Sequence, residues 1–207
     1  MATRLSRSLK ASLTKQLQRD SQVMAQTRSI IRGQFEVLHK QMMQDFETHP
    51  VTRELKSGPG SSNISGSLPR GNLFGFIGFE SGDDPTAEIE KLLSRTEIIL
   101  KRRSMGSNGF IWTYLVTAPS LNELYKATPM PWANGLSWLQ EMEGKGIPNL
   151  GQYMYKRSSV GRSGAGIQNT KLSGGGRVKI DYVKSLLNKF ESDLNSIDAS
   201  RVSKKYF

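Results

Sequence analysis

The chain of 207 residues contains no cysteine and two histidines, His39 and His49. Disulfides, thiolate metal sites and cysteine nucleophiles are therefore excluded. Two histidines are too few for a zinc site unless carboxylates complete it. No Ser-His-Asp arrangement and no Walker A motif is present, and the glycine-rich Gly161–Gly166 lacks the Lys-Ser/Thr of a phosphate loop. We therefore expect no enzymatic activity and no cofactor, and we interpret Gly161–Gly166 as a flexible interface loop.

Long apolar runs are also missing. No segment approaches the ~20 apolar residues that a membrane span needs, and the N-terminus has no apolar core of a secretory signal. We expect a protein that acts in the cytoplasm of the cell that makes it, with no membrane partner. Hydrophobic residues make up 36% of the chain, which predicts a modest core with substantial extended segments.

Acidic residues are fewer than basic ones, and the net charge is +11. The excess is uneven: residues 1–70 carry +6, 71–100 carry −4, 101–150 carry +2 and 151–207 carry +7. Basic ends around an acidic middle suit a polyanion, or a neighbouring copy whose acidic band meets a basic end. The alternative is a solvated surface that only keeps the protein soluble.

The first 48 residues show a helical pattern. Leucines recur every fourth residue from Leu5 to Leu17, and apolar residues with helical spacing continue from Val23 to Phe46. The pattern predicts a helix over 23–47, ending before His49-Pro50, with breaks or bends near Ser21 and Gly33. Residues 1–22 are interpreted as an arm that reaches a partner, the alternative being a helix folded back into the core. The cations of this arm are Arg4, Arg7, Lys10, Lys15 and Arg19.

The apolar segment Leu73–Phe79 is predicted to be a central strand covered on both faces, because aromatic and β-branched residues dominate it. Residues 96–103 and 110–117 predict a hairpin, with Lys101, Arg102 and Arg103 at its tip. A fourth strand is expected over 136–142. The predicted fold is α+β: a long N-terminal helix, a small, mostly antiparallel sheet of about four strands, a C-terminal helix and long Gly-rich loops.

Two long loops interrupt this pattern, over 57–72 and 144–177. Loops of this length are usually functional or disordered, and the first is expected to be ordered by another subunit. The second carries aromatic and cationic side chains that either contact another protein, the interpretation we favour, or stack on bases and bind phosphates. These residues are Tyr153, Tyr155, Lys156, Arg157 and Arg162. The expected organisation is an arm over 1–22, one domain over 23–200 and a basic tail over 201–207.

Three polar residues are predicted to cap the starts of helices. Asp84 is predicted to cap a short helix with Pro85 at its first position, Ser120 to cap a second helix and Asp181 the last one. Glu141 and Glu143 are expected on one face of the fourth strand, where they have acid–base chemistry only if they line a cleft.

Two short segments carry a resemblance to a known family. His49-Pro50-Val51-Thr52-Arg53-Glu54-Leu55 follows the long helix, and Trp138-Leu-Gln-Glu-Met-Glu143-Gly144 follows the hairpin. The order of elements resembles the neck and tail-completion proteins of tailed bacteriophages. That family has a Pro-Val-x-Thr-Gly-x-Leu-type segment and a strand with an aromatic residue followed by Glu-x-Gly-Thr. Here the glycine before leucine is missing, and Lys145 follows Glu143-Gly144.

The resemblance implies an α+β subunit of the virion that assembles into a ring of six or twelve copies between portal and tail, around the DNA channel. Its implied partners are other copies of itself, other neck, portal or tail proteins, and DNA without sequence readout. Assembly would take place in the host cytoplasm. The alternative function is a non-specific nucleic-acid-binding protein that uses the basic arm and the Tyr153–Arg162 loop.

Overall fold

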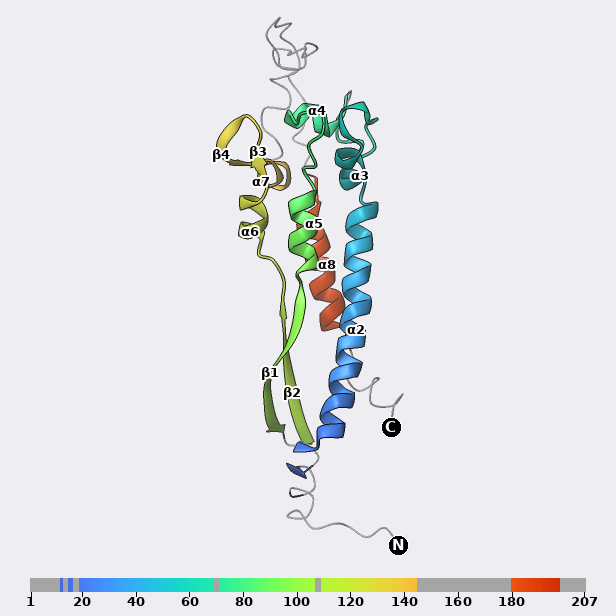
Figure 1. The fold of residues 1–207 in the computed structure, drawn as a ribbon, viewed down its shortest axis with the longest axis vertical. Helices are drawn as coiled ribbons and strands as arrows, with labels where there is room; N and C mark the ends of the chain where they lie inside the picture. The colour runs from blue at the N-terminus through green and yellow to red at the C-terminus, as the bar shows by residue number, and fades with distance from the viewer. Residues whose placement is uncertain are drawn as a thin grey trace, which may run out of the picture. The chain divides into compact units, whose positions relative to one another are not determined.

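The structure is a computed structural model that describes residues 12, 15, 16, 19–68, 71–106, 109–144 and 180–197. These residues fall in two compact units (Figure 1). Unit 1 lies within 1–42, 95–118 and 189–207, and unit 2 within 43–94 and 119–188. The α+β class is confirmed. The division into an arm, one domain and a tail stays a prediction.

The long N-terminal helix is α2, which runs from Ser21 to Thr48. Asp20 accepts hydrogen bonds from the amides of Gln22 and Val23, so the predicted break near Ser21 is a helix start. The helix continues through Gly33, so there is no break at this residue. In unit 1, Phe35 is buried and its ring meets Phe190 edge-on at 6.2 Å. Phe190 belongs to the last helix, α8 (Val183–Asn195).

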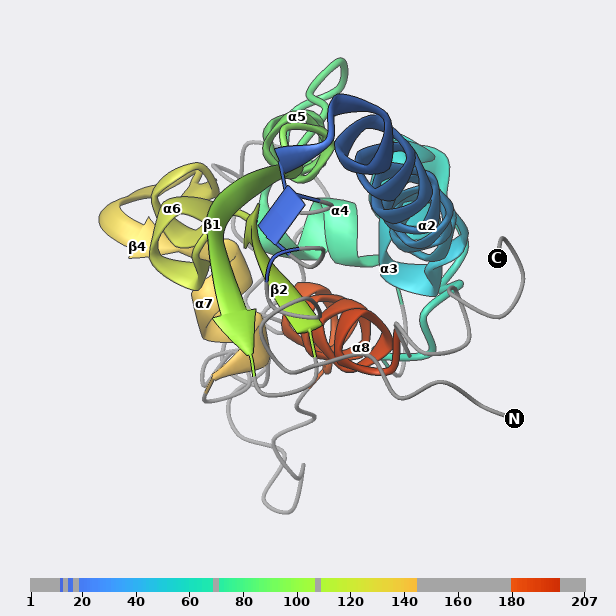
Figure 2. The ribbon, with the colours of Figure 1, turned by 90° about the horizontal axis from the view of Figure 1, so that it is seen from below.

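The predicted hairpin is confirmed and belongs to unit 1. Strand β1 (Glu97–Gly106) pairs antiparallel with β2 (Gly109–Thr117), and the two strands twist about each other (Figures 1 and 2). The register shifts between Leu100 and Arg102, which places a bulge at Lys101.

Unit 2 is built from short elements. In chain order they are α3 (Pro50–Lys56), the 3-10 turn η1 (Gly58–Gly60), α4 (Leu73–Ile77), α5 (Ala87–Ser94), α6 (Leu121–Lys126), β3 (Pro129–Met130), β4 (Ala133–Ser137) and α7 (Trp138–Glu143). The largest fully buried side chains in the structure include Trp138, Tyr182, Phe46 and Phe74, all in this unit. The core of unit 2 combines these aromatic side chains with buried aliphatic ones such as Leu55 and Leu139.

The predicted central strand over 73–79 is wrong, because Leu73–Ile77 forms the single-turn helix α4. The side chain of Asn72 caps it by accepting from the amide of Gly75 at 2.8 Å. Gly78 ends it in the left-handed conformation, with φ 94°. The two flanking residues, Asn72 and Gly78, outweigh the strand propensity of the apolar residues between them.

The predicted fourth strand over 136–142 is also wrong. Strand β4 ends at Ser137, whose hydroxyl accepts from the amide of Gln140 and so starts helix α7. The sheet of about four strands is accordingly two separate two-stranded antiparallel sheets, β1–β2 and β3–β4, among the described residues.

The 57–72 loop is held by its own chain, which corrects the expectation that only another subunit would order it. Buried Glu54 accepts from the amides of Ser65 at 2.7 Å and Leu73 at 2.6 Å. The side chain of Asn72 donates to the carbonyls of Pro59 and Ser61. The second predicted loop, 144–177, lies outside the described residues apart from Gly144.

The helix starts predicted at Ser120 and Asp84 can be compared with the observed starts of α6 and α5. Ser120 and Glu123 form a capping box at α6, as the predicted cap requires. Asp84 accepts from the amide and hydroxyl of Thr86 in the turn before α5. Helix α5 begins at Ala87, so Pro85 lies in this turn and not at the first helical position.

Candidate interaction surface

The described charges separate between the two units. Unit 1 has ten Lys or Arg and five Asp or Glu, whereas unit 2 has five Lys or Arg and twelve Asp or Glu. The described residues of unit 1 are thus net basic and those of unit 2 net acidic. The charge blocks of the sequence predicted a basic and an acidic part, and the fold gathers the separated basic segments 19–42 and 95–103 into one unit.

The cations predicted to contact a partner divide into two groups. Lys15, Arg19, Lys101, Arg102 and Arg103 are described and exposed. The cations of β1 lie at and just after the bulge, not at the turn of the hairpin, and Arg103 reaches back to the sulfur of Met24 on α2. The others lie outside the described residues: Arg4, Arg7, Lys10, Tyr153, Tyr155, Lys156, Arg157 and Arg162.

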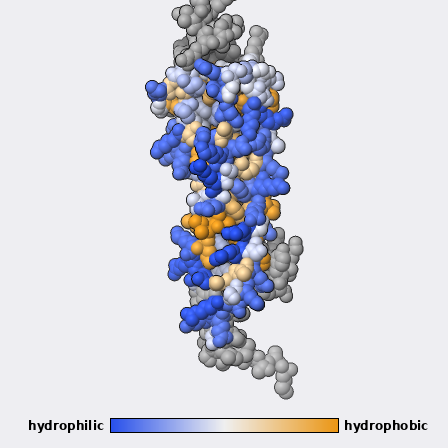
Figure 3. All heavy atoms as spheres, in the orientation of Figure 1, coloured by the Kyte–Doolittle hydropathy of each residue, from blue (hydrophilic) through white to orange (hydrophobic). Residues whose placement is uncertain are grey.

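The β1–β2 hairpin has one exposed apolar face. Ile99, Ile111 and Leu115 are 49%, 53% and 44% exposed. Ile99 lies directly opposite Leu115, and Arg102 lies opposite Thr113 in the next pair on the same face. Figure 3 shows apolar surface over this hairpin, beside hydrophilic residues. This face has the apolar composition of an interface centre, with exposed Glu97 beside it at one end and the exposed cations Lys101 and Arg102 at the other.

The opposite face of the hairpin is less exposed. Trp112, Tyr114 and Val116 alternate with the exposed residues and are partly buried. Burial raises the pKa of Tyr114, and the charge of Arg28 on α2 opposes that shift. Exposed and partly buried residues therefore alternate along β2, and this alternation decides which face is left for a partner.

Unit 2 also exposes large apolar side chains, at the β3–β4 hairpin. Trp132 is 47% exposed and Leu136 is 45% exposed. Trp132 is nevertheless fixed, because its ring nitrogen donates to the carbonyl of Ile77 at 2.8 Å. A Cβ atom on Gly78 would lie 3.0 Å from the Trp132 ring, so this contact requires glycine. The acidic Glu80 and Asp83 follow in the same loop and are exposed.

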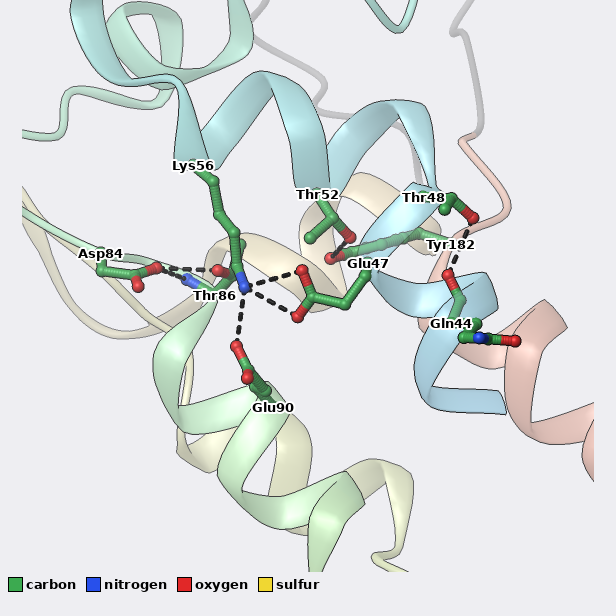
Figure 4. A network of polar contacts seen from close by, with 9 residues as sticks. All are labelled: Gln44, Glu47, Thr48, Thr52, Lys56, Asp84, Thr86, Glu90 and Tyr182. Atoms are coloured by element: carbon green, nitrogen blue, oxygen red, sulfur yellow. Dashed lines mark hydrogen bonds and ion pairs between the residues drawn. The ribbon is translucent and has the colours of Figure 1, made fainter. Parts of the chain in front are cut away.

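A polar network links α2, α3 and α5 within unit 2 (Figure 4). Lys56 donates to Glu47 at 2.8 Å and to Glu90 at 2.7 Å. Partial burial acts to lower the pKa of Lys56, but hydrogen bonds and charge interactions with the two carboxylates outweigh it and raise that pKa. All three side chains are partly exposed, so the network orients helices more than it stabilises them.

The two segments of the family resemblance meet at the start of α8. From α3, Thr52 shares a buried 2.7 Å hydrogen bond with the hydroxyl of Tyr182. The ring of His49 lies 4.8 Å from the ring of Tyr182. From α7, Glu143 accepts from the amide of Lys184 at 2.9 Å. Segments that are distant in sequence therefore converge on one helix terminus.

Burial governs the titration of this cluster. It raises the pKa of Tyr182, and the hydrogen bond from Thr52 only partly offsets that. Burial lowers the pKa of His49 against a hydrogen bond with the backbone of Asp181. It raises the pKa of Glu143, while backbone hydrogen bonds led by that of Lys184 oppose the rise.

The geometry gives Glu143 a capping role and not the predicted pairing with Glu141. Both residues lie on helix α7, so they do not share a strand face. Glu143 is buried and bound to backbone amides, whereas Glu141 is partly exposed. Over the described part of the chain, no group of three His, Asp or Glu side chains is arranged to hold a metal ion. The same residues include no helix that is long and apolar enough to cross a membrane.

Sequence reasoning missed Glu54, Tyr182 and Trp132. Glu54 stands in the mixed segment Val51-Thr52-Arg53-Glu54-Leu55, which gives no sequence signal for a buried, hydrogen-bonded carboxylate. The roles of Tyr182 and Trp132 depend on partners 130 and 55 residues away. No local pattern indicates those partners.

Comparison with known proteins finds no family model, no characterised protein and no solved structure that matches this chain.

Proposed function

We propose that the protein is a structural subunit of a tailed-phage virion that forms a homo-oligomeric ring in the neck or tail-completion region. The ring, of six or twelve copies, joins the portal to the tail around the DNA channel and contacts other virion proteins. The single observation that carries this proposal is the charge separation between the described residues of unit 1 and those of unit 2. Opposite charge on two surfaces of one chain favours head-to-tail contacts, which form rings when the rotation between copies closes.

Two further features support it. The segments that carry the family resemblance, 49–55 and 138–144, lie together in the folded unit 2 and contribute Thr52 and Glu143 to one cluster. Each unit also exposes large apolar side chains, at Leu115 and at Trp132 for example. Exposed apolar groups beside charge are the composition of protein interfaces.

The test is the oligomeric state of the purified full-length chain. Mass photometry and negative-stain electron microscopy are expected to show closed rings, formed by the chain alone or on addition of neck or portal components. A chain that stays monomeric in all these mixtures would contradict the proposal.

The second candidate function is non-specific nucleic-acid binding. The observation that favours it is the exposed cations Lys101 and Arg102 on a net basic unit. It predicts that a monomeric chain binds DNA of arbitrary sequence, with affinity that falls steeply with salt. It also predicts that Lys156→Glu/Arg157→Glu abolishes DNA binding and leaves any assembly intact.

A further inference from the structure

Two exposed surfaces of the chain are complementary in charge. The hairpin patch consists of Ile99, Ile111 and Leu115 with Arg102 beside them, in unit 1. The tryptophan patch consists of Trp132 and Leu136 with Glu80 in the loop that Trp132 contacts, in unit 2. Five of the six exposed large apolar side chains in the described structure belong to these two patches.

We infer that the hairpin patch of one copy binds the tryptophan patch of a second copy. This inference rests on the proposed function, because it names the surfaces through which copies in the ring meet. The commitment to a second copy comes from charge. The hairpin patch has two exposed cations beside it, Lys101 and Arg102, against one exposed anion, Glu97. It therefore suits an acidic apolar partner, and the tryptophan patch with Glu80 and Asp83 is one.

Charge also excludes contacts between like patches. Pairing two hairpin patches would bring Lys101 and Arg102 of one copy against the same cations of the other, and pairing two tryptophan patches would do the same with Glu80 and Asp83. Like-charge contacts lower affinity, whereas the mixed contact is attractive. A mixed contact is heterologous, so each added copy leaves one patch of each kind free until a ring closes.

Trp132 is the expected anchor of this contact. Its indole is held by the hydrogen bond to Ile77 and by the contact with Gly78, yet nearly half of the residue faces solvent. A side chain that is already fixed loses little conformational entropy on binding. Tryptophan is also among the residues that contribute most to interfaces. The apolar side chains of the hairpin patch supply the surface against which the indole packs.

The test uses two variants of the full chain, each with one patch reversed in charge. Arg102→Glu/Leu115→Glu alters the hairpin patch, and Glu80→Lys/Leu136→Lys alters the tryptophan patch. All four residues are exposed, so both variants are expected to fold, which circular dichroism and urea unfolding would check. We expect each variant alone to need about 100-fold higher concentration to assemble, from two interface substitutions of about tenfold each.

The mixture of the two variants is the decisive measurement. In an equimolar mixture, the intact patch of each variant finds the intact patch of the other. Mass photometry is then expected to show heterodimers at concentrations at which neither variant alone assembles. The two altered patches carry opposite charges but have lost the apolar side chains of Leu115 and Leu136, so larger species are expected only at higher concentration. A mixture that stays monomeric, or either variant alone assembling like the wild type, would overturn the inference.

A matched control tests whether a loss of assembly comes from altering the hairpin patch or only from changing the net charge. Arg32→Glu/Val37→Glu makes the same change in charge within unit 1, and both residues are exposed on α2 outside the hairpin patch. This control is expected to assemble like the wild type. If it loses assembly as fully as the hairpin variant does, the contact is not at the hairpin.

The absence of cysteine permits a direct readout of contact. Leu115→Cys and Leu136→Cys each introduce a single thiol. A short bismaleimide is expected to cross-link a mixture of the two into heterodimers, with little product from either alone. Cross-linking that is equally efficient in the separate variants would overturn the mixed pairing.

The outcomes also separate this inference from the ring proposal. Rings that persist in both patch variants would refute the proposed contact between the two patches but would agree with the proposed ring. Complementing heterodimers from a wild type that forms open filaments would support the patches and refute the ring. A wild type that stays monomeric in every mixture would refute both.

Discussion

Buried polar side chains hold unit 2 together at single positions. Thr52, Glu54 and Glu143 are all buried, and each hydrogen-bonds a partner outside its own helix. Buried polar groups with satisfied hydrogen bonds contribute modestly to stability, but removing one partner leaves the other desolvated and unpaired. The strongest single-residue effects are therefore expected where one member of such a pair is deleted.

The Thr52–Tyr182 hydrogen bond gives the first residue-scale prediction. Tyr182→Phe removes one hydroxyl and leaves that of Thr52 buried without this partner. We expect the free energy of unfolding to fall by about 1–3 kcal/mol, measured by urea denaturation. Thr52→Val, which removes the other hydroxyl with little change in volume, should have a similar effect.

The double variant Thr52→Val/Tyr182→Phe is the control for this pair. Since no unpaired hydroxyl remains, its loss of stability should be smaller than the sum of the two single losses. Strictly additive losses would show that the two hydroxyls do not stabilise each other in the folded protein.

Glu143 gives a pH-dependent prediction. Burial raises its pKa in the folded state, so between the unfolded and the folded pKa the native state binds more protons. The stabilisation associated with this group is then fully present below the ordinary pKa of Glu and is lost as pH rises through the folded pKa. We expect the stability of the wild type relative to Glu143→Gln to decrease as pH rises across this window, measured by urea denaturation at each pH.

Glu143→Gln is a suitable reference because its side-chain oxygen still accepts from the amide of Lys184 but does not titrate. Subtracting its stability at each pH removes the contributions of the other carboxylates. A difference between the two proteins that is constant with pH would mean that folding does not shift the pKa of this carboxyl.

At the scale of elements, capping residues decided two assignments that propensity predicted wrongly. Residues 73–77 and 138–142 are rich in large apolar side chains, and both were predicted as strands. Asn72 and Ser137 each accept an amide hydrogen bond from three residues ahead, which starts a helix in both cases. The hairpin was predicted correctly because two strand-like segments flank a short loop that contains two glycines.

The 57–72 loop gives an element-scale prediction. Glu54 binds the amides at two points of this segment, Ser65 and Leu73. Glu54→Ala leaves both amides without their acceptor, and we expect a loss of about 2–4 kcal/mol for two charge-assisted bonds. Amide hydrogen exchange at Ser65 and Leu73 should become faster than exchange in helix α2.

Glu88→Ala is the matched control for this loss of a carboxylate. Glu88 forms an exposed ion pair with Lys91 within helix α5, so its removal should change stability by no more than about 0.5 kcal/mol. Equal effects of the two substitutions would contradict the role of Glu54 in ordering the loop.

At the scale of the whole molecule, charge separation is the dominant feature. The described residues are net basic in unit 1 and net acidic in unit 2. Contacts between copies through these residues are expected to depend on ionic strength, because the Debye length falls from ~10 Å at 0.1 M to ~3 Å at 1 M salt. We expect the midpoint concentration for assembly, measured by mass photometry, to rise steadily over this range of sodium chloride. Assembly that strengthens with salt would indicate contacts that are apolar alone.

The sequence by itself determined the features that depend on neighbouring residues. These are the amphipathic helix up to Thr48, the alternation of the β1–β2 hairpin, the capping box at Ser120 and the unequal charge of the segments. Only the tertiary structure decided that Glu54 orders a distant loop, that Trp132 is fixed against Gly78 and that Glu143 and Thr52 meet at the start of α8. The physical reason is that a hydrogen bond between residues 11 to 130 positions apart leaves no periodic signal in the chain.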